Sequence, residues 1–287
     1  MLAIAGGLGA ALSWATATVA SSRSSRMIGP LSVLGWVMVV GLVASIAPAI
    51  LSVSAPIGPL ELIELLLIGA SYTTGLLLAY AGLSIGRVSI VAPITATEGA
   101  AAAVLSVILG ASLRPMTAVI LAIIVVGVVL AAYERAADPE RPRATDPATQ
   151  RRTVMLALAA AAAFSVGLVL AGKVGAAGVS PAWVIVAGRG VGTLAIAVPL
   201  TLRGRFRLVR PAVPLVVTSG LLEALGSGLY VIAASVDIPT AAVVSSQFAA
   251  IAALAAFVLF GERLQRVQVL GVGLIVLGVT LLAASQA

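Results

Sequence analysis

Residues Pro115–Ala132 read PMTAVILAIIVVGVVLAA, an apolar run of 18 residues without a charged side chain. As a helix this run is about 27 Å long, close to the roughly 30 Å thickness of the hydrocarbon core of a bilayer. The chain contains ten runs of this kind, each about 18–26 residues long. We therefore expect an all-α membrane protein with ten transmembrane helices. These are Leu2–Ala20, Pro30–Ser52, Leu60–Leu83, Val88–Leu109, Pro115–Ala132, Thr153–Val174, Pro181–Leu202, Pro211–Val236, Pro239–Phe260 and Val267–Ala284.

Composition supports the bilayer as the solvent. The chain is 61% hydrophobic and only 9% charged, with a mean hydropathy of +1.19, whereas soluble domains are about 45–50% apolar and about 25% charged. Too few ionisable side chains are present to cover a soluble domain of this size. The runs are also too long and too uniformly apolar for the alternating strands of a membrane barrel.

Missing residue types exclude several kinds of chemistry. The sequence has no cysteine and no histidine, which excludes disulfides, thiolate nucleophiles, the usual zinc sites and imidazole proton relays. No arrangement of a nucleophile with a base is visible in the sequence. We therefore expect no cofactor, no metal and no catalytic residues, and thus not an enzyme.

An internal repeat organises the chain. Shifting the sequence by 151 residues aligns Leu62–Ala132 with Val213–Ala283 without a gap. The aligned pairs include the glycines at 69 and 220, at 75 and 226, and at 110 and 261, and the run IVVGVVL at 124–130 meets IVLGVTL at 275–281. The expected domains are a first five-helix repeat at 1–132, a charged linker at 133–152 and a second five-helix repeat at 153–287. An odd number of helices per repeat turns the second copy upside down, as in many secondary transporters.

Arginines in the loops set the expected orientation. The loops after the odd-numbered helices carry 14 arginines, whereas the other side has only Arg114 and Lys173. The positive-inside bias therefore places the odd-numbered loops in the cytoplasm and both termini outside. Because these basic residues form no stripe on a soluble domain, we expect no nucleic-acid partner. The 14 are Arg23, Arg26, Arg87, Arg135, Arg141, Arg143, Arg151, Arg152, Arg203, Arg205, Arg207, Arg210, Arg263 and Arg266.

Two related segments carry a family resemblance. VAPITATEGAAAAVLSVILGASL at Val91–Leu113 and VVSSQFAAIAALAAFVLFGERL at Val243–Leu264 are each followed by an aliphatic helix with a central glycine. In these segments the chain resembles the EamA-type transporters of the drug/metabolite transporter superfamily, with Glu98 and Ala249 where the family often has proline. The resemblance implies export or exchange of amino acids, metabolites or amphipathic drugs through a central cavity lined mainly by helices three, four, eight and nine and their neighbours.

Three ionisable residues fall at membrane depth, where a charge is costly unless it is paired or hydrated. Glu98 lies beside Thr95 on a face of small side chains, where it could bind an amine, couple transport to protons or bond another helix. Glu223 shares a helical face with Ser219, Ser227 and Tyr230, which suits a polar cavity wall. Arg189 could hold a substrate carboxylate or pair with Glu98 or Glu223; we favour the internal ion pair.

Weaker candidates are polar or aromatic. Ser246 and Gln247, next to Ser245, could supply hydrogen bonds across the cavity. Trp14, Tyr72 and Tyr80 could stack on a substrate, although aromatic residues in membrane helices more often serve packing or anchor at the interface. Glu64 and Lys173 lie near helix ends, and we expect them to be solvated.

The sequence thus favours a secondary transporter for a small molecule, embedded in the lipid bilayer of a prokaryotic inner membrane as a monomer or homodimer, with or without proton coupling. We expect Leu2–Ala20 to be the first membrane helix and not a cleaved signal, because no basic segment precedes it. The alternatives are a lipid flippase, a channel or a structural membrane protein. Only a carrier exchanges substrate by counterflow.

Overall fold

A computed structural model describes residues 1–86, 91, 94–112, 114–131, 147–248, 250–252 and 266–285. Within these ranges every regular element is a helix, and no strand occurs. Six segments are long and apolar enough to cross a membrane: α1 (Leu2–Ile28), α2 (Pro30–Leu51), α3 (Pro59–Ile85), α7 (Pro147–Ala176), the continuous stretch Pro181–Leu202, and Arg210–Ala234.

The last two segments are built from several elements. Pro181–Leu202 consists of α8 (Pro181–Gly192), the π-helix η1 (Thr193–Ala197) and α9 (Val198–Leu202). Arg210–Ala234 consists of the 3₁₀ turn η2 (Arg210–Ala212) and α10 (Val213–Ala234). The remaining helices are α5 (Glu98–Ile108), α6 (Pro115–Ala131), α11 (Ile238–Ser245) and α13 (Arg266–Ser285).

Local sequence explains where the helices begin and end. Proline occupies the first turn of α2, α3 and α8, where its missing N–H is not needed. Gly29 separates α1 from α2 with a φ of 83°, a conformation that glycine adopts without strain. Side chains of Ser180 and Asp237 cap α8 and α11 by accepting backbone N–H groups. Short polar and glycine-containing segments therefore set the helix ends.

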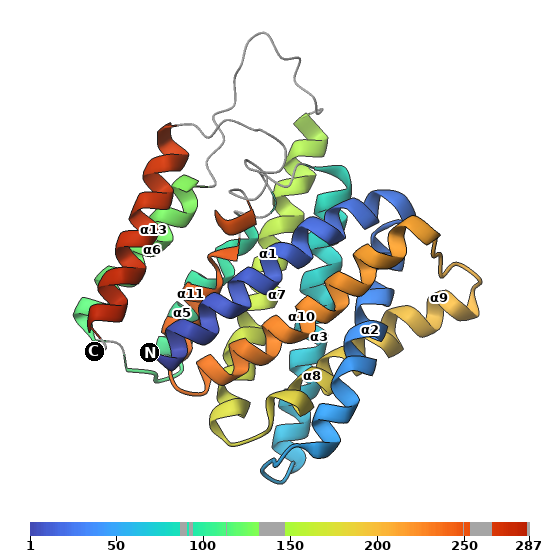
Figure 1. Ribbon diagram of the computed structural model, residues 1–287, viewed down its shortest axis with the longest axis horizontal. Helices are drawn as coiled ribbons and strands as arrows, with labels where there is room; N and C mark the ends of the chain where they lie inside the picture. Colours follow the sequence, from blue (N-terminus) through green and yellow to red (C-terminus); the bar gives the residue numbers. More distant parts are fainter. Residues whose placement is uncertain are drawn as a thin grey trace.

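Helices from opposite halves of the sequence pack against each other. In Figure 1, α1 and α10 run side by side through the bundle, and α3 lies against α7. Helix α2 packs on α8, α5 packs on α11, and α6 pairs with α13 at one edge. The core between them is rich in alanine and valine, and α1, α3 and α10 also bury glycines, as expected where helices approach closely in a membrane.

Two glycines allow close contacts between equivalent pairs of helices from the two halves. A Cβ atom on Gly69 of α3 would lie 2.7 Å from Val191 Cγ2 of α8. A Cβ atom on Gly220 of α10 would lie 2.7 Å from Val40 Cβ of α2. Both distances are far below van der Waals contact, so a larger residue at either position would push the helices apart.

Two helices extend beyond their expected ends. Helix α1 continues past Ala20 through Arg23 and Arg26 to Ile28, because its serines are buried and satisfy backbone groups. For example, Ser24 Oγ donates to Ala20 O at 2.9 Å. Helix α7 begins at Pro147, inside the segment expected as linker. The hydropathy pattern missed both extensions because polar residues do not end a helix.

The expectation that Glu64 is solvated is wrong, whereas Lys173 is exposed as expected. Glu64 is only 8% exposed, and Lys173 Nζ lies 2.6 Å from Glu64 Oε1. The pair joins α3 to α7, which the sequence alone did not bring together. Several residues named in the sequence analysis lie outside the described ranges: Arg87, Leu113, residues 133–146, Ala249, Gly261, Arg263 and Leu264.

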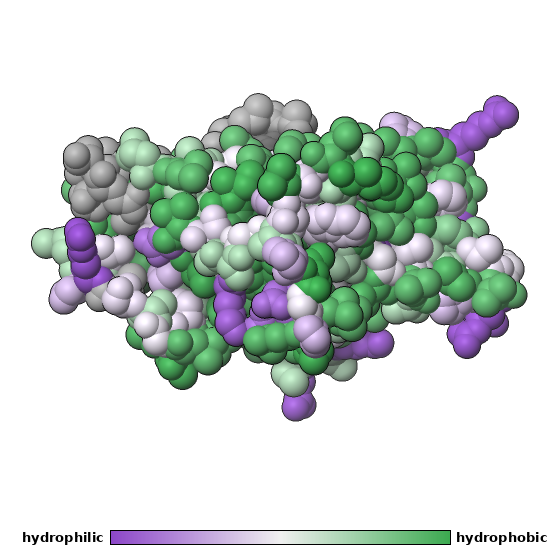
Figure 2. All heavy atoms as spheres, turned by 90° about the horizontal axis from the view of Figure 1, so that it is seen from below, coloured by the Kyte–Doolittle hydropathy of each residue, from purple (hydrophilic) through white to green (hydrophobic). Residues whose placement is uncertain are grey.

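The outer surface is strongly apolar. Figure 2 shows hydrophobic side chains over much of the visible face, with charged side chains projecting at a few places. Large exposed apolar residues occur along the membrane-length helices, including Val43 on α2, Leu66 on α3 and Leu225 on α10. A soluble protein would not expose so much apolar surface, so this exterior suits lipid.

Candidate functional site

A central cavity lies between helices of both halves of the chain. It encloses about 560 Å³ of empty space, including its opening. The wall is formed by side chains from α1, α3, α7 and α10, from the start of α5 and the residues before it, and from the segment after α11. These side chains are Trp14, Thr18, Tyr72, Leu76, Ala79, Tyr80, Leu83, Val91, Thr95, Glu98, Phe164, Glu223 and Phe248.

Glu98 is the first residue of α5 and faces the cavity. It is 5% exposed, and its carboxylate makes no hydrogen bond or ion pair with any described residue. The neighbouring Gly99 explains its position, because a Cβ atom there would lie 2.4 Å from Ala242 O of α11. This close contact fixes the start of α5 against α11. Glu98 is therefore held at the cavity wall with a carboxyl group that no described side chain binds.

Glu223 of α10 also lines the cavity, but its charge has a partner. Arg189 Nη2 of α8 lies 3.6 Å from Glu223 Oε2, with both side chains nearly buried. This is one of the two internal pairings expected from the sequence. Arg189 also donates to Ser227 Oγ at 3.3 Å and to Met38 Sδ at 3.8 Å. A buried charge of this kind is tolerated at membrane depth because it is paired.

Arg189 faces a second, smaller pocket, not the central cavity. This pocket has an empty volume of about 300 Å³ and is lined by Tyr72, Val184, Ile185, Gly188, Arg189, Ser227 and Val231. Tyr72 contributes to both spaces. Its Oη atom is buried and has no hydrogen-bond partner among the described residues. Tyr72 therefore stands between the carboxylate-lined cavity and the arginine-lined pocket.

Two glycines make room for aromatic rings at the cavity wall. A Cβ atom on Gly75 of α3 would lie 2.6 Å from Phe164 Cδ1 of α7. A Cβ atom on Gly226 of α10 would lie 2.6 Å from Trp14 Cδ1 of α1. The indole Nε1 of Trp14 is buried and has no hydrogen-bond partner in the part of the chain that the structure describes.

Tyr80 joins three helices at the cavity wall. Ser21 Oγ of α1 lies 3.0 Å from both Tyr80 Oη of α3 and Ser219 Oγ of α10. Ser219 Oγ in turn donates to Ala17 O at 3.2 Å. Ser21 and Ser219 are completely buried. Hydrogen bonds between helices in a membrane are individually modest, but this cluster ties α1, α3 and α10 together beside the cavity.

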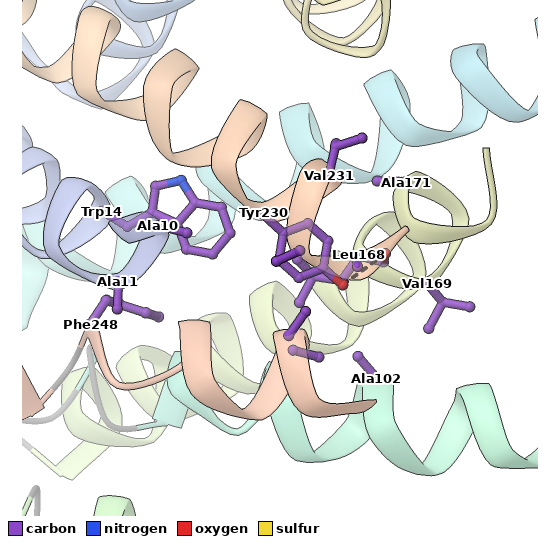
Figure 3. Close-up of a cluster of buried hydrophobic side chains, with 14 of the residues drawn as sticks. Ala10, Ala11, Trp14, Ala102, Leu168, Val169, Ala171, Tyr230, Val231 and Phe248 are labelled. Carbon is purple, nitrogen blue, oxygen red and sulfur yellow. Dashed lines mark hydrogen bonds between the residues drawn. The ribbon is translucent and has the colours of Figure 1, made fainter. Parts of the chain in front are cut away.

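Three expected site residues lie outside both cavities. Tyr230 is fully buried beside Trp14 in the core and donates from Oη to Leu168 O at 2.9 Å (Figure 3). Ser246 Oγ and Gln247 Nε2 both bond to Val243 O, at 2.8 Å and 3.0 Å. In this conformation these side chains support the packing of α10 and α11.

Sequence reasoning missed several residues of the cavity wall. Thr18 lies one helical turn after Trp14, so the helical period could have identified it. Phe248 lies one helical turn after Ser245, so the same period could have identified it. Phe164 carried no such signal, because it stands in an apolar run with no polar neighbour at helical spacing. Among the described residues, no group of three or more acidic, histidine or cysteine side chains could hold a metal.

Comparisons with known proteins agree with this architecture. The model of the EamA-like transporter family matches residues 1–133 and again residues 151–284. No curated protein matches the chain. Among 24 matching chains of solved structures, one crystal structure is 20% identical, covers 99% of this chain and 98% of its own, and superposes with a TM-score of 0.73. At this identity the likeness shows a shared fold only.

Proposed function

Because the chain belongs to the EamA-like transporter family, and is therefore a multi-pass membrane transporter for a small molecule, we propose that it works by alternating access. In this proposal it exports or exchanges an amino acid or an amphipathic metabolite or drug. The observation that carries the proposal is the central cavity, which contains two buried carboxylates and is bounded by helices of both halves. Such a site can be exposed to either side when two similar halves exchange shapes.

The proposed architecture is ten transmembrane helices in two inverted repeats, at 1–132 and 153–287, joined by a linker at 133–152. Contacts between helices support this architecture. When each helix is replaced by the equivalent helix of the other repeat, every major packing pair becomes either the same pair or another pair that the structure contains. The glycine contacts agree at residue level: Gly69 touches Val191, and Gly220 touches Val40. The same shift of 151 residues relates Gly69 to Gly220 and Val40 to Val191, so the two contacts are equivalent.

We assign substrate contact to the cavity residues Trp14, Tyr72, Tyr80, Thr95, Glu98 and Glu223, with Arg189 and Ser227 holding Glu223 from the second pocket. Tyr230, Ser246 and Gln247 would reach a ligand only after α10 and α11 move. The arginine bias supports a cytoplasmic-membrane location with odd-numbered loops inside and both termini outside. A monomer or a homodimer is compatible with this site, because one chain encloses the cavity.

A counterflow assay tests the transport function. A thermal-shift screen of amino acids and organic cations would first identify ligands of the purified protein. Proteoliposomes loaded with an unlabelled ligand should then accumulate the labelled form transiently, because a carrier exchanges substrate across the membrane. A channel or a structural protein would only equilibrate the label. Equilibration without overshoot for every ligand that binds would refute the carrier proposal.

Proton coupling is a separate part of the proposal and rests on Glu98. A buried carboxylate without a protein partner can bind and release a proton during the transport cycle. Glu98→Gln should abolish uptake driven by a pH gradient while leaving exchange of substrate measurable. Glu61→Gln, at the start of α3 and outside the cavity, is the matched control. Unchanged pH-driven uptake in Glu98→Gln would remove Glu98 from this role.

A further inference from the structure

Aromatic residues are concentrated at the central cavity. The chain has only three tryptophans, four tyrosines and five phenylalanines. Five of these twelve residues line the cavity: Trp14, Tyr72, Tyr80, Phe164 and Phe248. They come from four separate parts of the chain, so the clustering is a property of the fold and not of local sequence. Aromatic rings on several sides of a site provide flat apolar surfaces for a ligand.

The backbone is adapted to hold two of these rings. Gly75 and Gly226 occupy equivalent positions in the two repeats. Each leaves the space that Phe164 or Trp14 fills, with hypothetical Cβ contacts of 2.6 Å. Each half therefore has a glycine that makes room for an aromatic ring from the other half at the cavity wall.

The charge of the wall is one-sided. Among the described residues that line the cavity, Glu98 and Glu223 are acidic and none is basic. Arg189 compensates Glu223 from the second pocket. Glu98 has no compensating partner among the described side chains. When ionised, the wall therefore carries one uncompensated negative charge in a space where charges are poorly solvated.

Resting on the transport function proposed above, we propose that the substrate is an organic cation with an apolar body, such as a quaternary or hindered ammonium compound. The cation would lie near Glu98, while its apolar groups contact the rings of Trp14 and Phe164. Desolvated aromatic faces attract cations, and aromatic cages are the usual recognition site for quaternary ammonium groups. The Glu98 charge would repel an anion in the same space, and no described residue lining the cavity is basic and could bind it.

The test compares three probes of similar size by their effect on tryptophan fluorescence. Phenyltrimethylammonium carries the permanent charge, tert-butylbenzene is its neutral isostere, and benzoate is an anion. Trp14 is the reporter, because the other two tryptophans, Trp36 and Trp183, are not among the residues lining the cavity. The cation should bind about tenfold or more tightly than either other probe.

Single-residue variants show which side chains contribute to the affinity for the cation. Glu98→Gln should weaken phenyltrimethylammonium binding by about tenfold or more, because it removes the negative charge and keeps the side-chain shape. Glu61→Gln should leave binding unchanged. Phe164→Leu should weaken the binding of phenyltrimethylammonium more than the binding of tert-butylbenzene, since the substitution removes an aromatic face but keeps apolar volume. Isothermal titration calorimetry measures these affinities without relying on the tryptophan signal.

The outcomes separate this inference from the transport proposal. Equal binding of the cation and its neutral isostere, or unchanged affinity in a folded Glu98→Gln protein, would overturn the cation assignment. Counterflow of another class of ligand would then still leave the carrier function intact. Conversely, tight Glu98-dependent cation binding without counterflow would support the site and refute the carrier.

Discussion

The ion pair between Arg189 and Glu223 allows the most quantitative prediction. At the observed separation of 3.6 Å, Coulomb's law with an effective dielectric constant of about 20 gives roughly 4–5 kcal/mol of attraction. The two side chains are 5% and 11% exposed, so little solvent screens them. Replacing one partner should therefore leave a buried charge that costs about 3–5 kcal/mol of folding stability.

Arg189→Met removes the guanidinium and retains an apolar side chain of similar length. We expect a large loss of stability, because Glu223 would remain in the cavity wall without its partner. Glu223→Gln should also destabilise the protein, since Ser227 and Met38 alone would solvate the Arg189 charge. The double variant should be more stable than Arg189→Met, because it removes both charges together.

Chemical unfolding in detergent, followed by tryptophan fluorescence, measures this double-mutant cycle. Arg203→Met is the control, because Arg203 is exposed after α9 and should change stability by about 0.5 kcal/mol or less. Additive losses in the double variant would refute the reasoning, because they would mean that the two residues contribute independently.

Two further predictions concern packing. Ser21→Ala should lower stability by about 0.6–1.7 kcal/mol, since it removes the link between Tyr80 and Ser219; an unchanged unfolding midpoint would argue against that link. Gly220→Ala should destabilise by about 1–3 kcal/mol because its Cβ would overlap α2, whereas at Gly188 a Cβ meets nothing within 4 Å and alanine should be tolerated. Equal unfolding midpoints for the two alanine variants would contradict this.

Hydropathy predicted much of the helical framework because a helix must have a certain length to cross the membrane. The expected run Pro30–Ser52 differs from α2 by one residue, since proline and a polar serine mark both ends. The C-terminal end of α1 was harder to predict, because Ser21 and Ser24 resemble loop residues when only the sequence is considered. They are helical because their hydroxyls have buried partners, and those partners belong to the tertiary structure.

The cavity was only partly predictable, for a similar reason. Glu98 and Glu223 could be identified because a carboxylate at membrane depth is rare and costly. Sequence could not decide which of them Arg189 meets, since this depends on how α8 sits against α10. Phe164 could not be identified at all, because an apolar residue in an apolar helix gives no indication of the wall it faces.

Access to the cavity from both sides of the membrane tests the central claim most directly. The chain contains no cysteine, so Thr18→Cys places a single thiol on the cavity wall. A membrane-impermeant, water-soluble thiol reagent should label it from either side of proteoliposomes, with rates that a bound substrate lowers. Val104→Cys, on an exposed apolar face of α5, should label slowly under the same conditions. A Thr18→Cys protein that reacts from neither side, or from one side only during turnover, would contradict an alternating cavity.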